Sequence, residues 1–117
     1  MARISTADHN HVDELFYAGK FETLKEFVQN YTGYRFNLLL EFAEEGNLEI
    51  TRFLVDRCRL NPDVWELSST APLIVSRYYF HIASFLIQRG ANWRKIVLFN
   101  SFSSTEDVIK YLTLLSI

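Results

Sequence analysis

The sequence has very little cysteine, glycine or proline. Its 117 residues include one cysteine, four glycines and two prolines. The single cysteine, Cys58, excludes an internal disulfide framework, so we expect a protein of a reducing compartment such as the cytoplasm. So few glycines and prolines also exclude a long flexible linker or a low-complexity arm.

Long apolar runs are absent as well. The longest extend over only a few residues, as in the three leucines at 38–40, whereas a helix that crosses a membrane needs about 20 apolar residues. The first eight residues contain no apolar core of the kind that a secretory signal has. We therefore expect neither a targeting signal nor a membrane partner.

Apolar side chains are nevertheless abundant along the whole chain. They make up 49% of the residues, and aromatic residues make up 15%. This content is typical of a folded domain, because disordered chains lack the aliphatic and aromatic side chains that form a core. The length predicts a single domain that covers residues 1–117.

The charge is nearly balanced overall but unevenly distributed. The formal net charge is -2, so there is no basic excess of the kind that favours direct binding of nucleic acid. Residues 1–66 contain seven Lys and Arg against twelve Asp and Glu, a net charge of -5. Residues 67–117 contain five against two, a net charge of +3. The acidic first half would suit a basic partner.

Three segments share a pattern of apolar residues at helical spacing, and a fourth matches more loosely. They cover residues 19–28, 46–55, 78–87 and 105–112. Apolar side chains recur three and four positions apart, which predicts amphipathic helices, and no stretch alternates for long enough to predict a sheet. Each segment follows a short apolar stretch and a tight turn, which predicts helix–turn–helix pairs. The predicted helices cover residues 11–18, 21–30, 37–45, 48–58, 71–77, 80–89, 94–101 and 105–116.

Two parts of the chain resemble the ankyrin-repeat family. Residues 42–55 resemble a first helix that ends in a small residue, a turn of glycine and a polar residue, and a second helix. Residues 70–73 resemble the opening of a repeat, and residues 85–92 resemble the end of its second helix. The resemblance implies an all-α, ankyrin-like solenoid of about four helix–turn–helix repeats with short irregular hairpin connections. The implied units cover residues 11–34, 35–66, 69–92 and 93–117.

The pattern also departs from that family. Val28 and Val55 are 27 positions apart, and Val55 and Ile87 are 32 apart, whereas a full ankyrin repeat has about 33 residues. The connection over residues 58–63 lacks the usual glycine. A tetratricopeptide array is the structural alternative, but its period of about 34 residues fits the intervals less well.

One stretch near the start carries residue types that bind metals. Asp8, His9, Asn10 and His11 include two imidazoles and a carboxylate, but a closed site needs about four ligands and the only other histidine is His81. We therefore interpret this stretch as a solvated arm whose Asn10 caps the first helix. We expect no metal and no cofactor.

Aromatic and basic residues concentrate in the connections between the predicted units. Trp, Tyr and Arg dominate the binding energy of many protein interfaces, although the same side chains also pack over the ends of a stack. Acidic residues recur in the predicted helix 37–45, which in the resembled fold lines the concave side. The residues predicted to bind a partner are Tyr34, Arg35, Glu41, Glu44, Glu45, Trp65, Tyr78, Trp93 and Arg94.

A repeat stack has a long exposed surface and no enclosed cleft for catalysis. Cys58 is interpreted as a small buried apolar residue rather than a nucleophile. We therefore expect a non-enzymatic protein–protein interaction module, an adaptor, decoy or inhibitor that engages a host or cellular protein. It is similar to compact ankyrin-like proteins of intracellular bacteria and large DNA viruses, which implies a host cytoplasm or nucleus as further locations. The alternative is an immunity or antitoxin-type inhibitor of a specific enzyme, such as one that acts on nucleic acid.

The apolar stripes predict one continuous core. Replacing Leu54 or Leu86 by alanine should lower the free energy of unfolding by about 2–5 kcal/mol, because each truncation leaves a cavity in that core. Equilibrium unfolding in urea, followed by circular dichroism, measures the loss. A spectrum dominated by strand would contradict the helical prediction itself. The predicted core residues are Leu15, Leu24, Phe27, Leu39, Phe42, Ile50, Leu54, Leu73, Ile82, Leu86, Val108 and Leu112.

Overall fold

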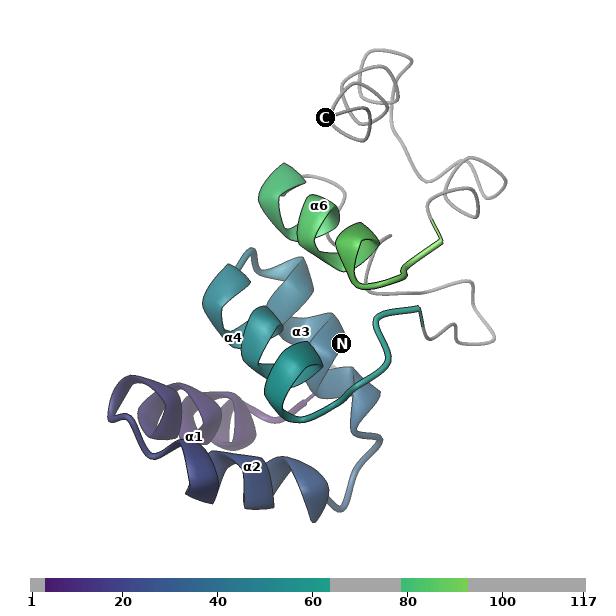
Figure 1. The fold of residues 1–117 in the computed structure, drawn as a ribbon. Helices are drawn as coiled ribbons and strands as arrows, with labels where there is room; N and C mark the ends of the chain where they lie inside the picture. The colour runs from purple at the N-terminus through teal and green to yellow at the C-terminus, as the bar shows by residue number, and fades with distance from the viewer. Residues whose placement is uncertain (1–3, 64–78, 93–117) are drawn as a thin grey trace.

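A computed structural model describes residues 4–63 and 79–92, and within these ranges the chain forms helices and no strand (Figure 1). This confirms the all-α prediction for the described part of the chain. In chain order the elements are α1 (Thr6–Tyr17), α2 (Phe21–Gln29), α3 (Phe36–Glu44), α4 (Leu48–Arg52), the π-helical turn η1 (Phe53–Arg57) and α6 (Phe80–Gln88).

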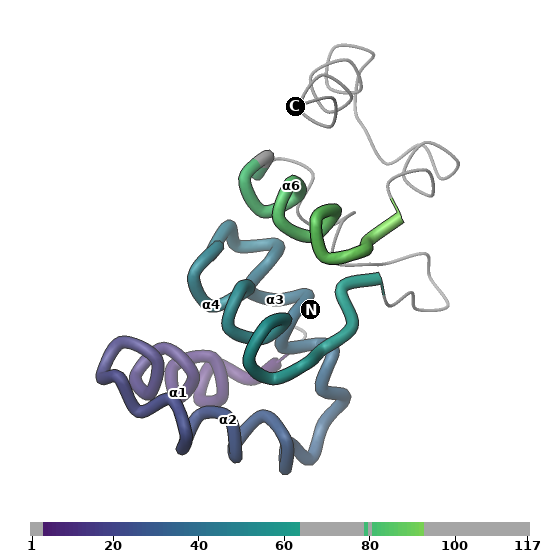
Figure 2. Tube along the Cα trace, viewed as in Figure 1, coloured from purple at the N-terminus to yellow at the C-terminus, as the bar shows by residue number. Residues whose placement is uncertain are grey.

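The helices lie in successive layers. Helices α1 and α2 pair with each other, α3 pairs with α4 and its continuation η1, and α6 packs on α4 (Figures 1 and 2). The predicted helices 21–30, 37–45, 48–58 and 80–89 agree with the structure to within one residue at each end. Those predicted over residues 71–77, 94–101 and 105–116 lie outside the described residues.

The turns inside the first two helix pairs have the same backbone structure. Gly19 has a φ of 74° and Gly46 a φ of 87°, a left-handed conformation that glycine adopts without steric cost. The residue after each glycine donates its N–H to the carbonyl five residues earlier, at 2.9 Å for Lys20 and 3.0 Å for Asn47. The two turns are 27 positions apart, which is the interval that the sequence pattern shows.

The helix formed by α4 and η1 and the helix α6 end in similar ways but differ by one residue. After α6, the N–H of Ala91 donates to the carbonyl of Leu86, five positions earlier, at 3.0 Å. After η1, the N–H of Leu60 donates to the carbonyl of Leu54, six positions earlier, at 3.1 Å. The longer closure follows the π-helical turn, whose hydrogen bonds reach back five positions rather than four.

The left-handed residue that ends each of these helices is also different. It is Gly90 after α6, with a φ of 104°, and Arg59 after η1, with a φ of 60°. A left-handed conformation costs a non-glycine residue about 1–2 kcal/mol. The neighbours of Arg59 in sequence, Cys58 and Leu60, are both buried, and their burial offsets this cost. This is how the chain turns at a connection that lacks the usual glycine.

The predicted core is largely confirmed. Helix α3 is its centre, because Leu38, Leu39, Leu40, Phe42 and Ala43 are each 1% exposed or less. Leu73, Val108 and Leu112 lie outside the described residues, and Phe27 is half-buried and packs against the core. The predicted residues that are buried are Leu15, Leu24, Leu39, Phe42, Ile50, Leu54, Ile82 and Leu86.

The predicted start of the first helix is wrong by five residues. Helix α1 begins at Thr6 rather than at residue 11, and its cap is Ser5 rather than Asn10. The hydroxyl of Ser5 accepts a hydrogen bond from the N–H of Asp8 at 3.0 Å, which is the usual chemistry of an N-cap. The earlier start has a tertiary reason, since the carboxylate of Asp8 accepts a hydrogen bond from the hydroxyl of Tyr31 at 2.9 Å.

Helix α6 is joined to the layer below it by polar contacts at its end. Arg89 donates from Nε and Nη2 to the two carboxylate oxygens of Asp56 in η1, at 2.8 and 3.1 Å. Next to this pair, the N–H of Asn92 donates to Oδ1 of Asp63 at 3.0 Å. The ends of η1 and α6 therefore lie side by side.

The matching glycines allow a controlled test of the packing on the second turn. A Cβ added to Gly46 would lie 2.5 Å from Cε1 of Tyr79, whereas a Cβ added to Gly19 meets nothing within 4 Å. Both alanine variants should lose about 1–2 kcal/mol because both positions are left-handed. Gly46→Ala should lose about 1 kcal/mol more than Gly19→Ala, because the ring of Tyr79 must move.

Urea denaturation of both variants measures this difference. In a Tyr79→Ala background the additional loss at Gly46 should disappear, as a double-mutant cycle would show. Equal losses at the two glycines in the unmodified background would show that Tyr79 does not pack on the turn in solution.

Candidate functional site

An open depression lies where the turn between α1 and α2 meets the turn between α3 and α4. Its volume is about 570 Å³. We refer to it as the turn depression. It is lined by Tyr17, Glu45, Gly46, Asn47, Leu48 and Glu49.

Aromatic side chains border this depression. Tyr17, the last residue of α1, is 62% exposed, although its hydroxyl accepts a hydrogen bond from Nδ2 of Asn47 at 3.2 Å. Tyr79, directly before α6, is 44% exposed and its ring lies against Gly46. Asn47 also caps α4, because its Oδ1 accepts from the N–H of Ile50 at 3.0 Å. The rim is thus preorganised, and large aromatic surfaces are left open to solvent.

The charged lining of the depression is acidic. Glu45 and Glu49 supply carboxylates, and none of its six lining residues is basic. Of the three glutamates predicted to form an acidic patch, only Glu45 lines the depression. Glu41 is half-buried on α3, and Glu44 is exposed at the end of the same helix.

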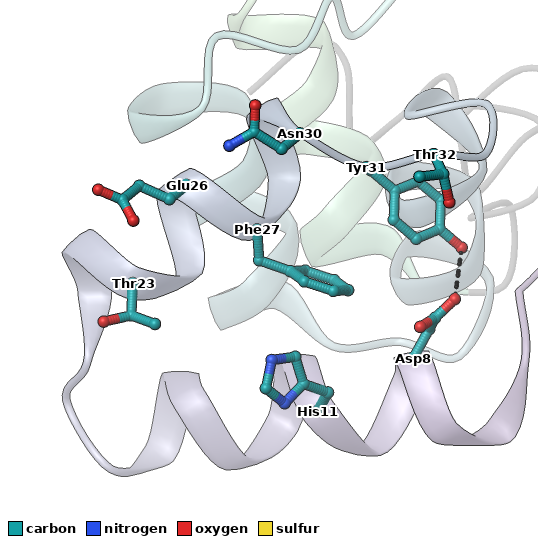
Figure 3. Close-up of a pocket in the computed structure, with 8 residues that line it drawn as sticks. All are labelled: Asp8, His11, Thr23, Glu26, Phe27, Asn30, Tyr31 and Thr32. Carbon is teal, nitrogen blue, oxygen red and sulfur yellow. Dashed lines mark hydrogen bonds between the residues drawn. The ribbon is translucent and has the colours of Figure 1, made fainter.

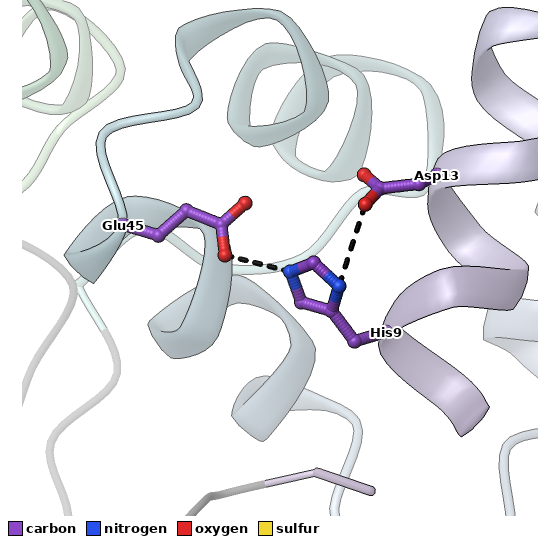
Figure 4. Close-up of side chains that lie close together, drawn as sticks. All are labelled: His9, Asp13 and Glu45. Atoms are coloured by element: carbon purple, nitrogen blue, oxygen red, sulfur yellow. Dashed lines mark hydrogen bonds and ion pairs between the residues drawn. The ribbon is translucent and has the colours of Figure 1, made fainter. Parts of the chain in front are cut away.

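Glu45 is held by a histidine from the first helix (Figure 4). Nε2 of His9 lies 2.6 Å from Oε2 of Glu45, and Nδ1 lies 3.3 Å from Oδ2 of Asp13, one turn further along α1. The ring stacks on Phe42 of α3, with centroids 4.9 Å apart and planes 19° apart. His9 therefore joins α1 to the end of α3 through Nε2 and one ring face, while Nδ1 faces Asp13 within α1.

This environment favours the protonated form of His9. Partial burial alone would lower its pKa. The hydrogen bond to Glu45 and the charges of Glu45 and Asp13 outweigh that effect, and a hydrogen bond to Asn10 adds to them. Together they raise the pKa of His9 above its ordinary value of 6.5.

The expectation of a solvated N-terminal arm is therefore wrong. His9 belongs to α1 and is half-buried, and His11 lies on another face of that helix, where its ring packs edge-on against Phe27 at 4.8 Å. One ligand atom from each of His9, Asp13 and Glu45 lies within 4.8 Å of the others. The two carboxylates, however, face different ring nitrogens (Figure 4), an arrangement of a hydrogen-bonded imidazolium rather than of ligands around one ion.

A second hollow of about 380 Å³ lies between α1 and α2 (Figure 3). Its side chains include Asp8, His11, Phe27 and Tyr31. The phenol of Tyr31 is partly buried and donates a hydrogen bond to Asp8, and these effects raise its pKa to about 12. The groups in this hollow contact one another in pairs across the two helices, so we interpret it as packing rather than as a binding site.

The predicted interface residues do not form one surface. Tyr34 and Arg35 are both exposed on the connection that precedes α3, with Tyr34 at 47%. Glu44 and Glu45 lie at the opposite end of α3, and nine helical residues span about 14 Å. The remaining predicted residues, Trp65, Tyr78, Trp93 and Arg94, lie outside the described residues.

Sequence reasoning missed the aromatic and histidine parts of the site. Tyr17 directly precedes the Ala18-Gly19 turn, and Asn47 directly follows Gly46, so both had a local signal as residues beside a glycine turn. No local signal connects His9 with Glu45, because 36 positions separate them.

Cys58 is buried, as predicted. Burial raises the pKa of its thiol to about 11, although the nearby Lys25 and Arg57 act in the opposite direction. A thiol with such a pKa is almost wholly protonated at neutral pH and is a poor nucleophile.

Comparison of the chain with protein-family models, with curated proteins and with solved structures gives no match. Over residues 4–63 and 79–92, no helix combines the length and the apolar character that crossing a bilayer requires. The proposed function therefore rests on the geometry and chemistry of the described residues.

The geometry of His9 predicts that the fold is independent of metal ions. Adding zinc, or a chelator, should leave the melting temperature unchanged, because one ion cannot contact both carboxylates and a ring nitrogen without turning the ring. Thermal unfolding followed by circular dichroism checks this. A melting temperature that increases with zinc concentration would show that the ion binds the folded state.

Proposed function

We propose that this protein is a non-enzymatic protein-interaction module, an adaptor, decoy or inhibitor, and that the turn depression binds its partner. The observation that carries the proposal is the exposed ring of Tyr17 at the rim of an open, acidic depression. Tyrosine is among the side chains that contribute most to binding at protein interfaces, because its ring buries a large area and its hydroxyl forms a hydrogen bond.

The layered helices support this proposal. Two helix pairs have matching turns around Gly19 and Gly46, and α6 adds a further layer. An array of repeats uses its stacked faces for the core and leaves its edges exposed for binding. The turn depression lies on such an edge, where side chains from two successive layers meet.

The chemistry of the depression also supports binding rather than catalysis. Glu45 is paired with His9, and the hydroxyl of Tyr17 is paired with Asn47. The depression is open to water, whereas a catalytic centre needs charged groups in a site from which water is excluded.

The acidic lining favours a partner with basic residues around an apolar contact. Charge complementarity of this kind accelerates association and selects partners. The same feature favours the second candidate, an immunity or antitoxin-type inhibitor, because enzymes that act on nucleic acid have basic surfaces.

Tyr34 and Arg35 remain a second predicted surface. They lie at the other end of α3 from Glu45, so a partner that binds both surfaces must extend along that helix. Two exposed tyrosines, Tyr17 beside the turn depression and Tyr34 before α3, therefore provide matched positions for locating the interface.

A photo-crosslinking experiment tests the proposal. A photoreactive phenylalanine analogue is placed at position 17 or at position 34, the protein is irradiated in a cell extract, and crosslinked proteins are identified by mass spectrometry. We expect one predominant partner from position 17. An identified enzyme whose activity the purified protein blocks stoichiometrically would support the inhibitor candidate.

The affinity of the identified partner then measures the contribution of each tyrosine. Tyr17→Ala should lose at least about 2 kcal/mol, roughly a 30-fold increase in Kd. Tyr34→Ala should have a much smaller effect. Tyr17→Phe, which removes only the hydroxyl, separates loss of ring contact from loss of the hydrogen bond to Asn47. Normal binding by a Tyr17→Ala variant that melts like the parent would reject the turn depression as the interface.

A further inference from the structure

We propose that His9 is a pH-sensitive clamp that fastens α1 to the end of α3 while its ring is protonated, and that weakens this junction when the proton is lost. The proposal is independent of the function proposed above. It rests on the position of one imidazole between two carboxylates that come from different layers of the fold.

The geometry requires a charged ring for both contacts to be favourable. A neutral imidazole has one N–H donor and one nitrogen acceptor, whereas an imidazolium has two donors. Nε2 faces Oε2 of Glu45 at 2.6 Å, and Nδ1 faces Oδ2 of Asp13 at 3.3 Å. In the neutral form, one ring nitrogen presents a lone pair to a carboxylate, and the attraction there becomes repulsion.

The groups that surround the ring all favour this interpretation. Asp13 faces it from α1 and Glu45 from the end of α3, and these are the charged residues whose interactions affect its titration. Asn10 of α1 adds a neutral hydrogen-bond partner, and Phe42 of α3 covers one face of the ring. Phe42 is fully buried, so the ring is anchored on the rigid core and cannot easily follow either carboxylate away.

The contact joins parts of the chain that no short turn connects. His9 and Glu45 are 36 positions apart, and the hydrogen bond between them joins α1 to the residue that directly follows α3. The hydrogen bond between Tyr17 and Asn47 joins the end of α1 to the same turn, but it has no group that titrates near neutral pH. Loss of the proton therefore weakens the junction between two layers rather than a bond within one helix.

The sign of the pH dependence follows from the direction of the shift. The pKa of His9 is raised in the folded state above its ordinary value of 6.5. The clamp then contributes its full stabilisation below about pH 6.5, and this contribution is lost as the pH rises through the folded-state pKa. A group whose pKa was lowered by folding would give the opposite slope.

Nuclear magnetic resonance tests the protonation directly on the unmodified chain. The ring resonances of His9 are titrated in the native protein and again in concentrated urea. We expect a higher pKa in the native protein, and we expect Glu45→Gln to bring that value closer to the one in urea. A native pKa at or below the value in urea would overturn the proposal, and this measurement does not depend on whether any variant folds.

Thermal melts test the consequence for the junction. His9→Gln should lower the melting temperature by about 2–5 °C at about pH 5.5, and the difference from the parent should shrink toward pH 8.5. This range lies above that in which ordinary carboxylates titrate, near about pH 4.

His11→Gln is the matched control. His11 is on the same helix, two positions away, and its ring packs against Phe27. The difference in melting temperature between the His11→Gln variant and the parent should stay constant across the pH range. A His9→Gln difference that stays constant with pH, or that grows as pH rises, would show that His9 contributes only packing and would overturn the clamp.

Discussion

Burial of one broad apolar face of α3 is the constraint on which the rest of this structure depends. Five of its nine residues are almost completely buried, whereas Asn37, Glu41 and Glu44 recur along the remaining side and are half-buried or exposed. A helix with so wide an apolar face is stable in water only when other elements cover that face. Nine-residue helices are also too short to be stable alone. The first helix pair, α4 with η1, and α3 itself therefore stabilise one another.

The two ends of this central helix also lead into exposed polar and aromatic side chains. The start of α3 follows the exposed Tyr34 and Arg35, and its end passes into Glu45 and the Gly46 turn. At that second end a histidine, an asparagine and a tyrosine from two layers meet. Glu45 consequently has two roles in the fold, as the partner of His9 and as part of the turn depression.

The parts of the candidate site differ in how far they were predictable. Glu45 was predicted to belong to an acidic binding surface, and in the structure it is exposed and lines the turn depression. Tyr34 and Arg35, which are only about ten positions from Glu45 in sequence, were predicted to bind the same partner. The nine residues of α3 place them at the opposite end of that helix from Glu45. His9 was assigned to a solvated arm because its contacts with Phe42 and Glu45 involve residues distant in sequence, and no periodicity reports such contacts.

Sequence alone determined the helices between residues 21 and 57, the glycine turns at 19 and 46, and most of the core. These features depend on hydrogen bonds between residues three to five positions apart and on apolar spacing, both of which are local. Only the tertiary structure decided that α1 begins at Thr6, that the helix after Arg52 continues as a π turn, and that His9 reaches Glu45. The spacing of residues along the chain does not report these features, because contacts with distant parts of the chain accompany each of them.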